Sequence, residues 1–416
     1  MSSGAARSAP VVCDDAKVLA PARVRWVRLL AGPAPVAAVV LVAAVAAAVL
    51  TSLRGGLTDL GVYQEAGRAL VAGPPATAPR DPVTGLSFTY PPFASVVMVP
   101  LAFVPAWLAA AVWTGASTAA LAAAVALVRR AQDRPAPGWL AAAVAGGAVA
   151  LEPVWQNLAF GQVNVLVMTA VLVDLLRTER RWSGVLLGLA AGVKLTPLVF
   201  VVLLVLVGRR ATARRALVAF GLTVASGFLV APRWAVSYWT DGLVDAGRVG
   251  PPSLTHNQSV YGALTRLLDA RPSLPLWLAV ALPVGVAIVV TARARWHRGD
   301  VLLATCLAAL AGLVVSPISW SHHWVWAVPV ALVLWERSRW AAASWTAVFV
   351  ARPILWPPWG GRREYAWGPV EHLVGNVYLL AALAVCVWAV LPLTHRPAYA
   401  VGESARGRER FRMPQR

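Results

Sequence analysis

The chain has 416 residues, of which 59% are hydrophobic and 13% are charged, and its mean hydropathy is +0.66. These values exclude an ordinary soluble globular domain and identify a membrane protein. The formal net charge of +19 does not indicate nucleic-acid binding, because the basic residues form short clusters between apolar runs, as the positive-inside rule predicts.

The apolar runs are typical of helical spans rather than of a β-barrel. They are long, rich in Ala, Leu and Val, and lack the alternation of a membrane strand. We therefore predict an all-α polytopic membrane protein with no sizeable soluble domain. Cysteines occur only at positions 13, 306 and 386, so no disulfide framework is expected.

The N-terminal part of the chain sets the predicted orientation. Residues 1–30 are polar and basic, which places them in the cytoplasm, and the first span is expected at 33–50. Residues 54–90 then form the first extracytoplasmic loop, which carries Asp59 and an amphipathic helix at 61–70 that lies in the membrane interface.

The next segment, 91–128, is too long for one straight helix and contains Pro100 and Pro105. The arginines that follow it, from 129 to 134, should be cytoplasmic. We therefore expect a broken or re-entrant entry followed by one net crossing.

The remaining chain supplies ten more apolar segments. If residues 183–207 form a hairpin that turns at Lys194, all the basic clusters fall on the cytoplasmic side of the membrane. The two arms are short for a membrane span, so the alternative is that they enter and leave the membrane on the same side. About twelve transmembrane helices result, in one domain at 31–394, with a basic, disordered cytoplasmic tail at 395–416. The ten segments are 138–151, 164–176, 183–193, 197–207, 216–231, 274–292, 300–316, 324–335, 341–356 and 374–393.

In this topology, polar residues that are unusual for a membrane domain all lie in the extracytoplasmic loops. Charged groups are costly near hydrocarbon and tend to mark functional sites, so we predict a pocket for an anionic, lipid-attached ligand. The candidates are Asp59, Tyr63, Tyr90, Glu152, Gln162, Asn164, Lys194, Arg248, His256, Asn257, Gln258, Trp320, His322 and His323.

Several of these residues also have a structural interpretation. Asp59 has the spacing of an N-cap for the interfacial helix, and Lys194 alternatively extends to the membrane interface from a helix end. His322 and His323 are adjacent, so in a helix they point in different directions and one of them should be structural. Most tryptophans are expected in the interface belt.

No cofactor or metal is expected. The chain contains no His-Glu-x-x-His, Cys-x-x-Cys or paired acidic metal motif. The glycines at 184–192 lack the spacing of a phosphate-binding loop, which argues against ATP-driven chemistry.

Five motifs, in this order, resemble glycosyltransferase family 87, in particular the actinobacterial polyprenol-phosphate-mannose-dependent α-(1→2) mannosyltransferases that elongate phosphatidylinositol mannosides. The resemblance runs from about residue 56 to 326, and the C-terminal third matches by hydropathy alone. The motifs are Phe-Thr-Tyr-Pro-Pro-Phe at 88–93, Gly-Gln-Val-Asn-Val-Leu at 161–166, Gly-Val-Lys-Leu-Thr-Pro at 192–197, residues 245–251 with Asn-Gln-Ser at 257–259, and residues 313–326 around Ser-His-His-Trp.

The resemblance implies a GT-C fold and a metal-independent, inverting enzyme on the outer face of the plasma membrane. Its donor would be a polyprenyl-phosphate mannose and its acceptor a glycolipid. The family's catalytic aspartate corresponds to Asp59, and a family histidine corresponds to His322 or His323. His256 stands directly before Asn257, where the family pattern has an apolar or aromatic residue. The resemblance therefore defines acceptor recognition less well than donor binding.

Elementary chemistry agrees with this interpretation. Transfer from a lipid phosphate needs one base for the acceptor hydroxyl, which we assign to Asp59, because phosphate leaves without being protonated. Lys194, Arg248 and one of His322 and His323 would stabilise the developing phosphate charge. We expect the substrates to contact Tyr63, Tyr90, Glu152, Gln162, Asn164, His256, Asn257, Gln258 and Trp320.

Three alternatives remain open at this stage. The first is an enzyme of the same class that transfers another polyprenyl-linked sugar, such as arabinose or glucose, or that acts on a lipoglycan or protein acceptor. A transporter of a lipid-linked substrate would also need polar groups in the membrane, although inverted repeats are not visible in the sequence. A non-catalytic partner subunit is the third alternative.

Overall fold

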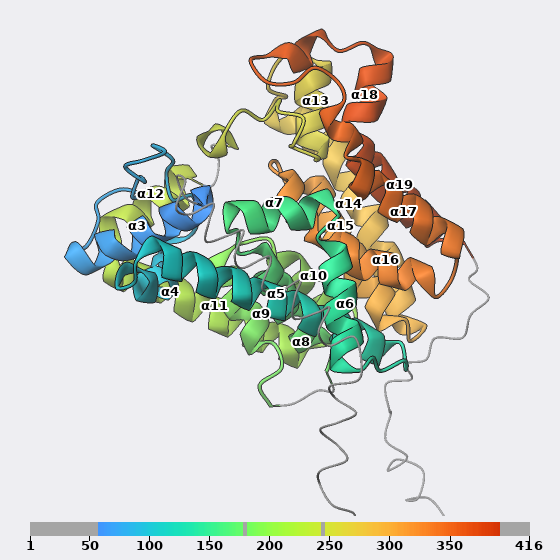
Figure 1. Cartoon of the computed structure of the whole chain (residues 1–416), viewed down its shortest axis with the longest axis horizontal. Coiled ribbons are helices and arrows are strands. Elements are labelled where there is room, and N and C mark those ends of the chain that lie inside the picture. Colours follow the sequence, from blue (N-terminus) through green and yellow to red (C-terminus); the bar gives the residue numbers. More distant parts are fainter. Residues whose placement is uncertain (1–56, 178–180, 243–245, 392–416) are drawn as a thin grey trace, which may run out of the picture.

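The computed structural model describes residues 57–177, 181–242 and 246–391, which form a bundle of helices (Figure 1). Within these residues, β structure is limited to two isolated bridges, Arg80 with Ser87 and Asn257 with Trp320. The all-α class is therefore confirmed for this part of the chain. The predicted first span, the basic N-terminus, the first residue of the motif at 245–251 and the tail lie outside the described residues.

Among the described residues, short helices outnumber long ones in both halves of the chain. The N-terminal half contains α3 (Thr58–Ala72), α4 (Pro92–Ala102), α5 (Ala106–Ala131), α6 (Gly138–Ala148), α7 (Glu152–Phe160), α8 (Asn164–Leu176), α9 (Val185–Val193), α10 (Leu198–Leu206), α11 (Arg210–Val230) and α12 (Pro232–Ser237). After η1 (Tyr238–Gly242) and η2 (Ala246–Val249) come α13 (Val260–Leu267), α14 (Leu274–His297), α15 (Val301–Val315), η3 (Ser321–Trp326), α16 (Ala327–Trp335), α17 (Arg339–Ala351), η4 (Pro353–Leu355), η5 (Arg363–Ala366), α18 (Pro369–Gly375) and α19 (Val377–Trp388).

Three of the described helices, α5, α11 and α14, are long and apolar enough to cross a membrane. Two bent pairs pass the same test as broken spans: α6 with α7, at 90°, and α18 with α19, at 69°. The structure therefore supports three to five spans among the residues it describes. The expected total of about twelve remains a prediction.

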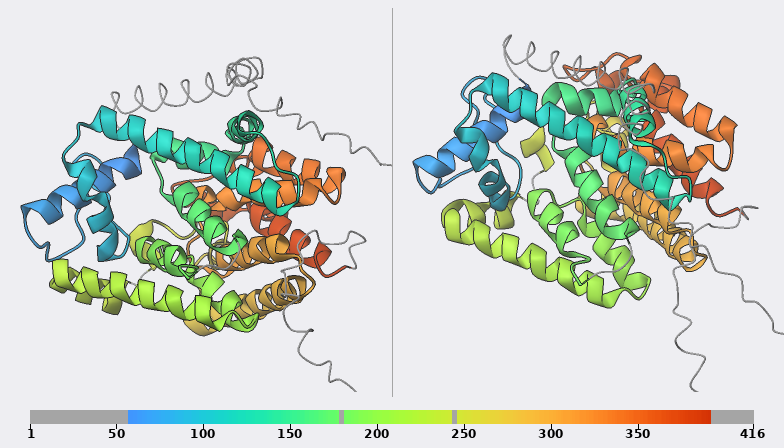
Figure 2. Two further views of the ribbon diagram at one scale, coloured as in Figure 1. Left: turned by 90° about the horizontal axis from the view of Figure 1, so that it is seen from below. Right: turned by 60° about the horizontal axis from the view of Figure 1, so that its bottom comes forward.

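Prolines lie at or next to two of the helix breaks that the sequence indicated. The break between α4 and α5 lies at 103–105, next to Pro100 and Pro105, and α5 supplies the single crossing expected there. The predicted hairpin turns between α9 and α10, which leaves Lys194 in the turn. Both views of Figure 2 place α5 and α11 on opposite flanks, with α8 and α9 between them.

Glycines allow several of these helices to pack backbone against backbone. A Cβ on Gly67 of α3 would lie 2.5 Å from the carbonyl oxygen of Met98 in α4. Gly188 of α9 approaches the carbonyl of Ala216 in α11 in the same way. Such small-residue contacts bring membrane helices close together, where dispersion forces are strong.

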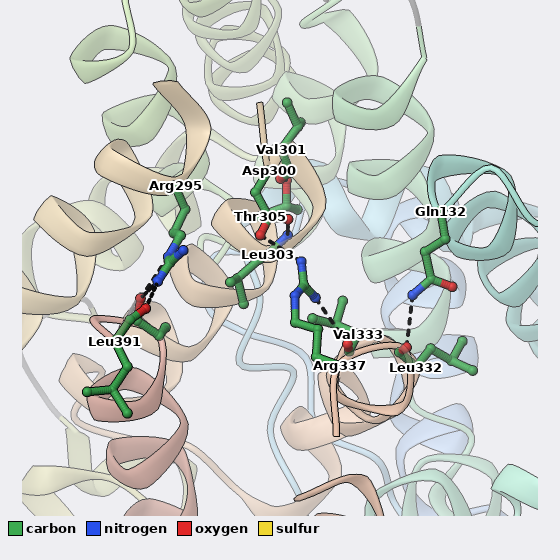
Figure 3. Close-up of polar contacts among 11 residues, drawn as sticks. Gln132, Arg295, Asp300, Val301, Leu303, Thr305, Leu332, Val333, Arg337 and Leu391 are labelled. Atoms are coloured by element: carbon green, nitrogen blue, oxygen red, sulfur yellow. Dashed lines mark hydrogen bonds and ion pairs between the residues drawn. The ribbon is translucent and has the colours of Figure 1, made fainter. Parts of the chain in front are cut away.

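Polar contacts join the helix ends at the opposite end of α15 from the segment 318–323 (Figure 3). The Arg295 guanidinium donates hydrogen bonds to the carbonyls of Ala389 and Leu391, just after α19. Arg337 donates to the Asp300 carboxylate at 2.6 Å, and it is largely shielded from solvent. These contacts satisfy backbone and charged groups that would otherwise be buried without partners.

The α3–α4 contact gives a first prediction. Gly67→Ala should lower the free energy of unfolding by about 1–3 kcal/mol, because its methyl group meets backbone atoms that cannot rotate away. Gly115→Ala is the matched control, since a Cβ there meets nothing within 4 Å and alanine favours a helix. Thermal unfolding in detergent measures both, and equal stability of the two variants would contradict the packing argument.

Candidate active site

A cavity of about 780 Å³ lies where the first described loop, the α7–α8 turn, the α9–α10 turn and the segment before η3 meet. Its size is within the range of small-molecule sites. Eight of the fourteen candidate residues line it. They are Asp59, Tyr90, Gln162, Lys194, Arg248, Trp320, His322 and His323.

Asp59 lies in the first turn of α3 and faces this cavity. The N-cap of α3 is Leu57, and Asp59 makes no capping hydrogen bond, so the capping interpretation does not account for it. Burial raises the pKa of Asp59 to about 6, while the nearby Gln162 amide and the charge of Lys194 oppose that rise. A carboxylate of this kind changes protonation near neutral pH, as a general base requires.

A glycine lets α3 approach the α7–α8 turn. Gly161 ends α7 with φ of 70°, and a Cβ there would lie 2.8 Å from the Cβ of Leu60. Any larger residue would be strained in this conformation and would press against Leu57 and Leu60, the neighbours of Asp59 in the chain.

Two tyrosines and two amides form a hydrogen-bonded network beside Asp59. The hydroxyls of Tyr63 and Tyr90 are 2.8 Å apart and lie 3.2 and 2.9 Å from Gln162 Oε1. Asn164 Nδ2 is 3.4 Å from the same oxygen and donates to the His322 carbonyl at 3.0 Å. Tyr63 and Asn164 support the cavity from behind rather than lining it.

Lys194 presents its ammonium group from the α9–α10 turn. Its Nζ donates to Asn164 Oδ1 at 2.5 Å and lies 5.4 Å from the centre of the Tyr90 ring. Burial lowers the pKa of Lys194 from 10.5 to about 7, even though the charge of Asp59 acts in the other direction. An anionic ligand would favour the charged form of this amine.

Both histidines of η3 line the cavity, although the sequence indicated that one would be structural. Their rings are nearly perpendicular, with centres 4.8 Å apart, and both residues lie in a 3₁₀ turn rather than in an α-helix. Within the described residues, His322 Nε2 and His323 Nδ1 are buried without a hydrogen-bond partner. Burial and the nearby charge of Lys194 lower the pKa of both imidazoles well below 6.5. Each is therefore neutral and offers hydrogen bonds rather than positive charge.

Arg248 and Trp320 also line the cavity. The guanidinium of Arg248 lies 5.0 Å from the centre of the Tyr238 ring, which also lines the cavity. Trp320 packs against Gly250 and forms the bridge with Asn257. Arg248 thus adds a second cation to the site.

Four other predicted site residues do not line the cavity. Glu152 is fully buried and accepts a hydrogen bond from Tyr378 at 3.2 Å, while His256 packs against Trp359. Asn257 accepts from Ser319 N, and Gln258 donates to two backbone carbonyls. Asn257 thus holds the segment that leads to the histidines, while the contacts of the other three side chains lie away from the cavity.

The sequence did not single out Arg80 and Tyr238, which also line the cavity. Arg80 lies on an exposed turn that is held by the Asp81 carboxylate, and Tyr238 begins η1. Neither belongs to a recognisable motif, and only the fold brings them close. In the described part of the chain, no three His, Cys, Asp or Glu side chains are grouped to hold a metal ion.

Comparison with known proteins is consistent with this geometry. Residues 88–317 match the model of glycosyltransferase family 87. A polyprenol-phosphate-mannose-dependent alpha-(1-2)-phosphatidylinositol mannoside mannosyltransferase of Mycobacterium tuberculosis is 36% identical over 366 residues, which cover 81% of this chain and 85% of that protein. The protein of the same name from Mycolicibacterium smegmatis is 36% identical over 79% of this chain and 82% of its own length.

A polyprenol-phosphate-mannose-dependent alpha-(1-2)-phosphatidylinositol pentamannoside mannosyltransferase of M. tuberculosis is 40% identical over 334 residues, which cover 75% of each chain. No solved structure matches the chain.

The buried amine gives a second prediction. Because the pKa of Lys194 is near 7 when folded and 10.5 when unfolded, the unfolded chain binds more protons between these values, so stability rises with pH across that window. Lys194→Met should remove this slope, raising Tm by several degrees at pH 6 and by less at pH 9. Thermal unfolding across this pH range measures the slope, and the same slope in both proteins would contradict the buried charge.

Proposed function

Because the chain belongs to glycosyltransferase family 87, we propose that it transfers mannose from polyprenol-phosphate mannose to a phosphatidylinositol mannoside and forms an α-(1→2) linkage. The chain is a glycosyltransferase with apolar membrane helices. The names of its relatives support the donor and acceptor. The observation that carries the proposal is the convergence of Asp59, Lys194, His322 and His323 on one cavity.

Asp59 acts as the general base. It accepts the proton of the acceptor hydroxyl as the hydroxyl oxygen attacks C1 of the donor sugar. The bond between C1 and the phosphate oxygen breaks, and its electron pair leaves with the polyprenyl phosphate. Asp59 is the only carboxylate among the described residues that line the cavity, so a single displacement with inversion is supported over a two-carboxylate, retaining route.

Lys194 and Arg248 stabilise the phosphate as negative charge develops on it. The two neutral imidazoles donate hydrogen bonds, which remain strong in a site of low polarity. No metal is required, because these groups already supply the positive charge and donors. The phosphate in turn keeps Lys194 protonated, since an adjacent opposite charge raises the pKa of an amine.

Catalysis takes place on the extracytoplasmic face in this proposal. Support comes from the basic residues at helix ends away from the cavity, such as Arg129 at the end of α5 and Arg337 after α16. Positive clusters of this kind favour the cytoplasmic side, which leaves the cavity outside.

A substitution at Asp59 tests the base. Asp59→Asn should lower kcat by about 10²–10⁴-fold, because an amide cannot accept the proton. Transfer of labelled mannose to purified phosphatidylinositol mannosides measures the effect, and size-exclusion chromatography checks folding. Glu65→Gln is the matched control, since Glu65 lies on the same helix but not on the cavity.

An Asp59→Asn variant with normal kcat would contradict the mechanism. Transfer of arabinose or glucose from their polyprenyl phosphates, without transfer of mannose, would instead change the donor assignment. Uptake of the lipid into sealed vesicles without product would favour a transporter.

The pH dependence of kcat/KM tests the charge states. Activity should rise as Asp59 loses its proton near pH 6 and fall as Lys194 loses its proton near pH 7, which gives a narrow optimum between them. The alkaline limb of kcat should lie at higher pH, because bound phosphate stabilises the ammonium. Flat profiles from pH 5 to 9 would contradict both assignments.

A further inference from the structure

We propose that Asn164 is a positioning residue, whose side-chain amide holds the Lys194 ammonium group and the turn with His322 and His323 in a fixed arrangement around the donor phosphate. This inference rests on the proposed function, because it concerns the phosphate-binding groups of that reaction. Asn164 is the first residue of α8 and is 6% exposed. The sequence predicted a substrate contact for it, but its side chain does not line the cavity.

An asparagine at the start of a helix often caps that helix, but Asn164 has a different role. The N-cap of α8 is Val163, and the Asn164 amide instead contacts two other parts of the chain, the α9–α10 turn and η3. These two segments bring Lys194 and the histidines to the cavity. Asn164 therefore joins the phosphate-binding groups to one another and to α8.

The chemistry of both partners fixes the orientation of this amide. An ammonium group can only donate, so the atom of Asn164 that lies 2.5 Å from Lys194 Nζ is the oxygen. A carbonyl oxygen can only accept, so the atom that lies 3.0 Å from the His322 carbonyl is the nitrogen, whatever the protonation state of the amine. Exchange of the two atoms would bring donor to donor and acceptor to acceptor. The two contacts therefore reinforce each other.

Little of the hydrogen-bonding capacity of this amide is left for a ligand. Asn164 Nδ2 also lies 3.4 Å from Gln162 Oε1, so its two protons serve two acceptors. Outside the cavity, Asn164 and Lys194 line a recess of about 30 Å³, which has room for about one water molecule. A sugar ring cannot enter a space of this size. Asn164 is thus placed to orient Lys194 rather than to bind sugar.

Lys194 needs such a partner because its side chain is long and flexible. Its backbone is already fixed, since it is the C-cap of α9 and its N–H donates to the Ala190 carbonyl at 2.9 Å. A lysine binds phosphate as a point charge at the end of a four-carbon chain, so the place of that charge has to be defined by a contact of the ammonium group. The contact with Asn164 uses one of its three protons and leaves two to donate to phosphate oxygens.

The contact with the His322 carbonyl positions the imidazoles. Asparagine side chains hold this segment at two places, because Asn257 accepts from Ser319 N at 2.9 Å and Asn164 donates to the His322 carbonyl. Within the described residues, His322 Nε2 and His323 Nδ1 are buried without a hydrogen-bond partner. The placement of these nitrogens therefore depends on the backbone that carries them. Asn164 sets the distance between that backbone and the phosphate-binding amine.

Other charged and titratable groups also face Lys194. They come from α3, the loop after it, η1, η2 and η3, and they are Asp59, Arg80, Tyr90, Tyr238, Arg248, His322 and His323. All of them are retained when Asn164 is replaced. A change in the titration of Lys194 would then report the loss of the Asn164 contact.

Replacement of Asn164 by leucine tests the inference through binding. Asn164→Leu keeps the approximate volume but removes both contacts, so the KM for polyprenol-phosphate mannose should rise about tenfold, while the KM for the acceptor should not change. Binding of a polyprenyl phosphate that carries no sugar should weaken by the same factor. Thr169→Val is the matched control, because Thr169 is buried on the same helix and donates to the carbonyls of Ala120 and Val165, away from the cavity.

The titration of Lys194 is a readout that needs no transfer and that a merely structural role would not move. Lys17 and Lys194 are the only lysines in the sequence, so lysine labelled with ¹³C at Cε gives a single NMR signal in a Lys17→Arg background. The pKa of Lys194 should fall by about one unit in Asn164→Leu, because the ammonium group loses its acceptor. It should rise by about one unit or more in Asn164→Asp, because an adjacent carboxylate favours the charged amine.

An unchanged pKa of Lys194 in both variants would overturn the positioning role. A raised KM for the acceptor, with an unchanged KM for the donor, would also overturn it and would indicate that Asn164 binds sugar. Asn164→Asp keeps an oxygen that accepts from Lys194, and its titration alone decides the inference if Asn164→Leu does not fold. If the wild type does not transfer mannose, the proposed function fails, but the titration still decides the role of Asn164.

Discussion

The cost of removing an acid and an amine from water at the same place determines the rest of this site. Asp59 and Lys194 face one cavity, and burial shifts the pKa of each toward neutrality. Among the described residues, no ion pair joins them directly. Lys194 donates instead to Asn164, and Asn164 donates to Gln162, which lines the cavity beside Asp59, so both charged groups remain available to a ligand.

The scaffold meets this requirement with interrupted helices. The reactive groups lie at helix ends and turns: Asp59 in the first turn of α3, Lys194 between α9 and α10, and the histidines in η3. Backbone groups at such ends lack helical partners, which is tolerated in a membrane protein where they line a polar cavity. Close packing between α3 and α4 and between α9 and α11 then holds these ends in position.

Sequence reasoning predicted the parts of the site that depend on local signals. Asp59 ahead of a helix, Lys194 in a hairpin turn and the paired histidines were recognised from their neighbours in the chain, and the cavity brings them together. Long-range partners were not predictable. Nothing in the sequence pairs Glu152 with Tyr378, which lies 226 residues away, or directs Asn257 toward backbone groups rather than a ligand. The number of membrane spans was also difficult to predict, because many of the described helices are short or bent and are not recognisable as single crossings.

The triangle of hydrogen bonds among Tyr63, Tyr90 and Gln162 has a consequence for the enzyme's catalytic cycle. Beyond the triangle, the Gln162 oxygen contacts only Asn164 among the described residues, and Asn164 leads back to Lys194 on the wall of the same cavity, so these contacts carry no proton onward into the protein. Under the proposed mechanism, the proton taken up by Asp59 has to leave through the mouth of the cavity. Regeneration of the base is thereby tied to the departure of the products, and the enzyme cannot be reset for another turnover while the glycolipid or the spent carrier still fills the opening.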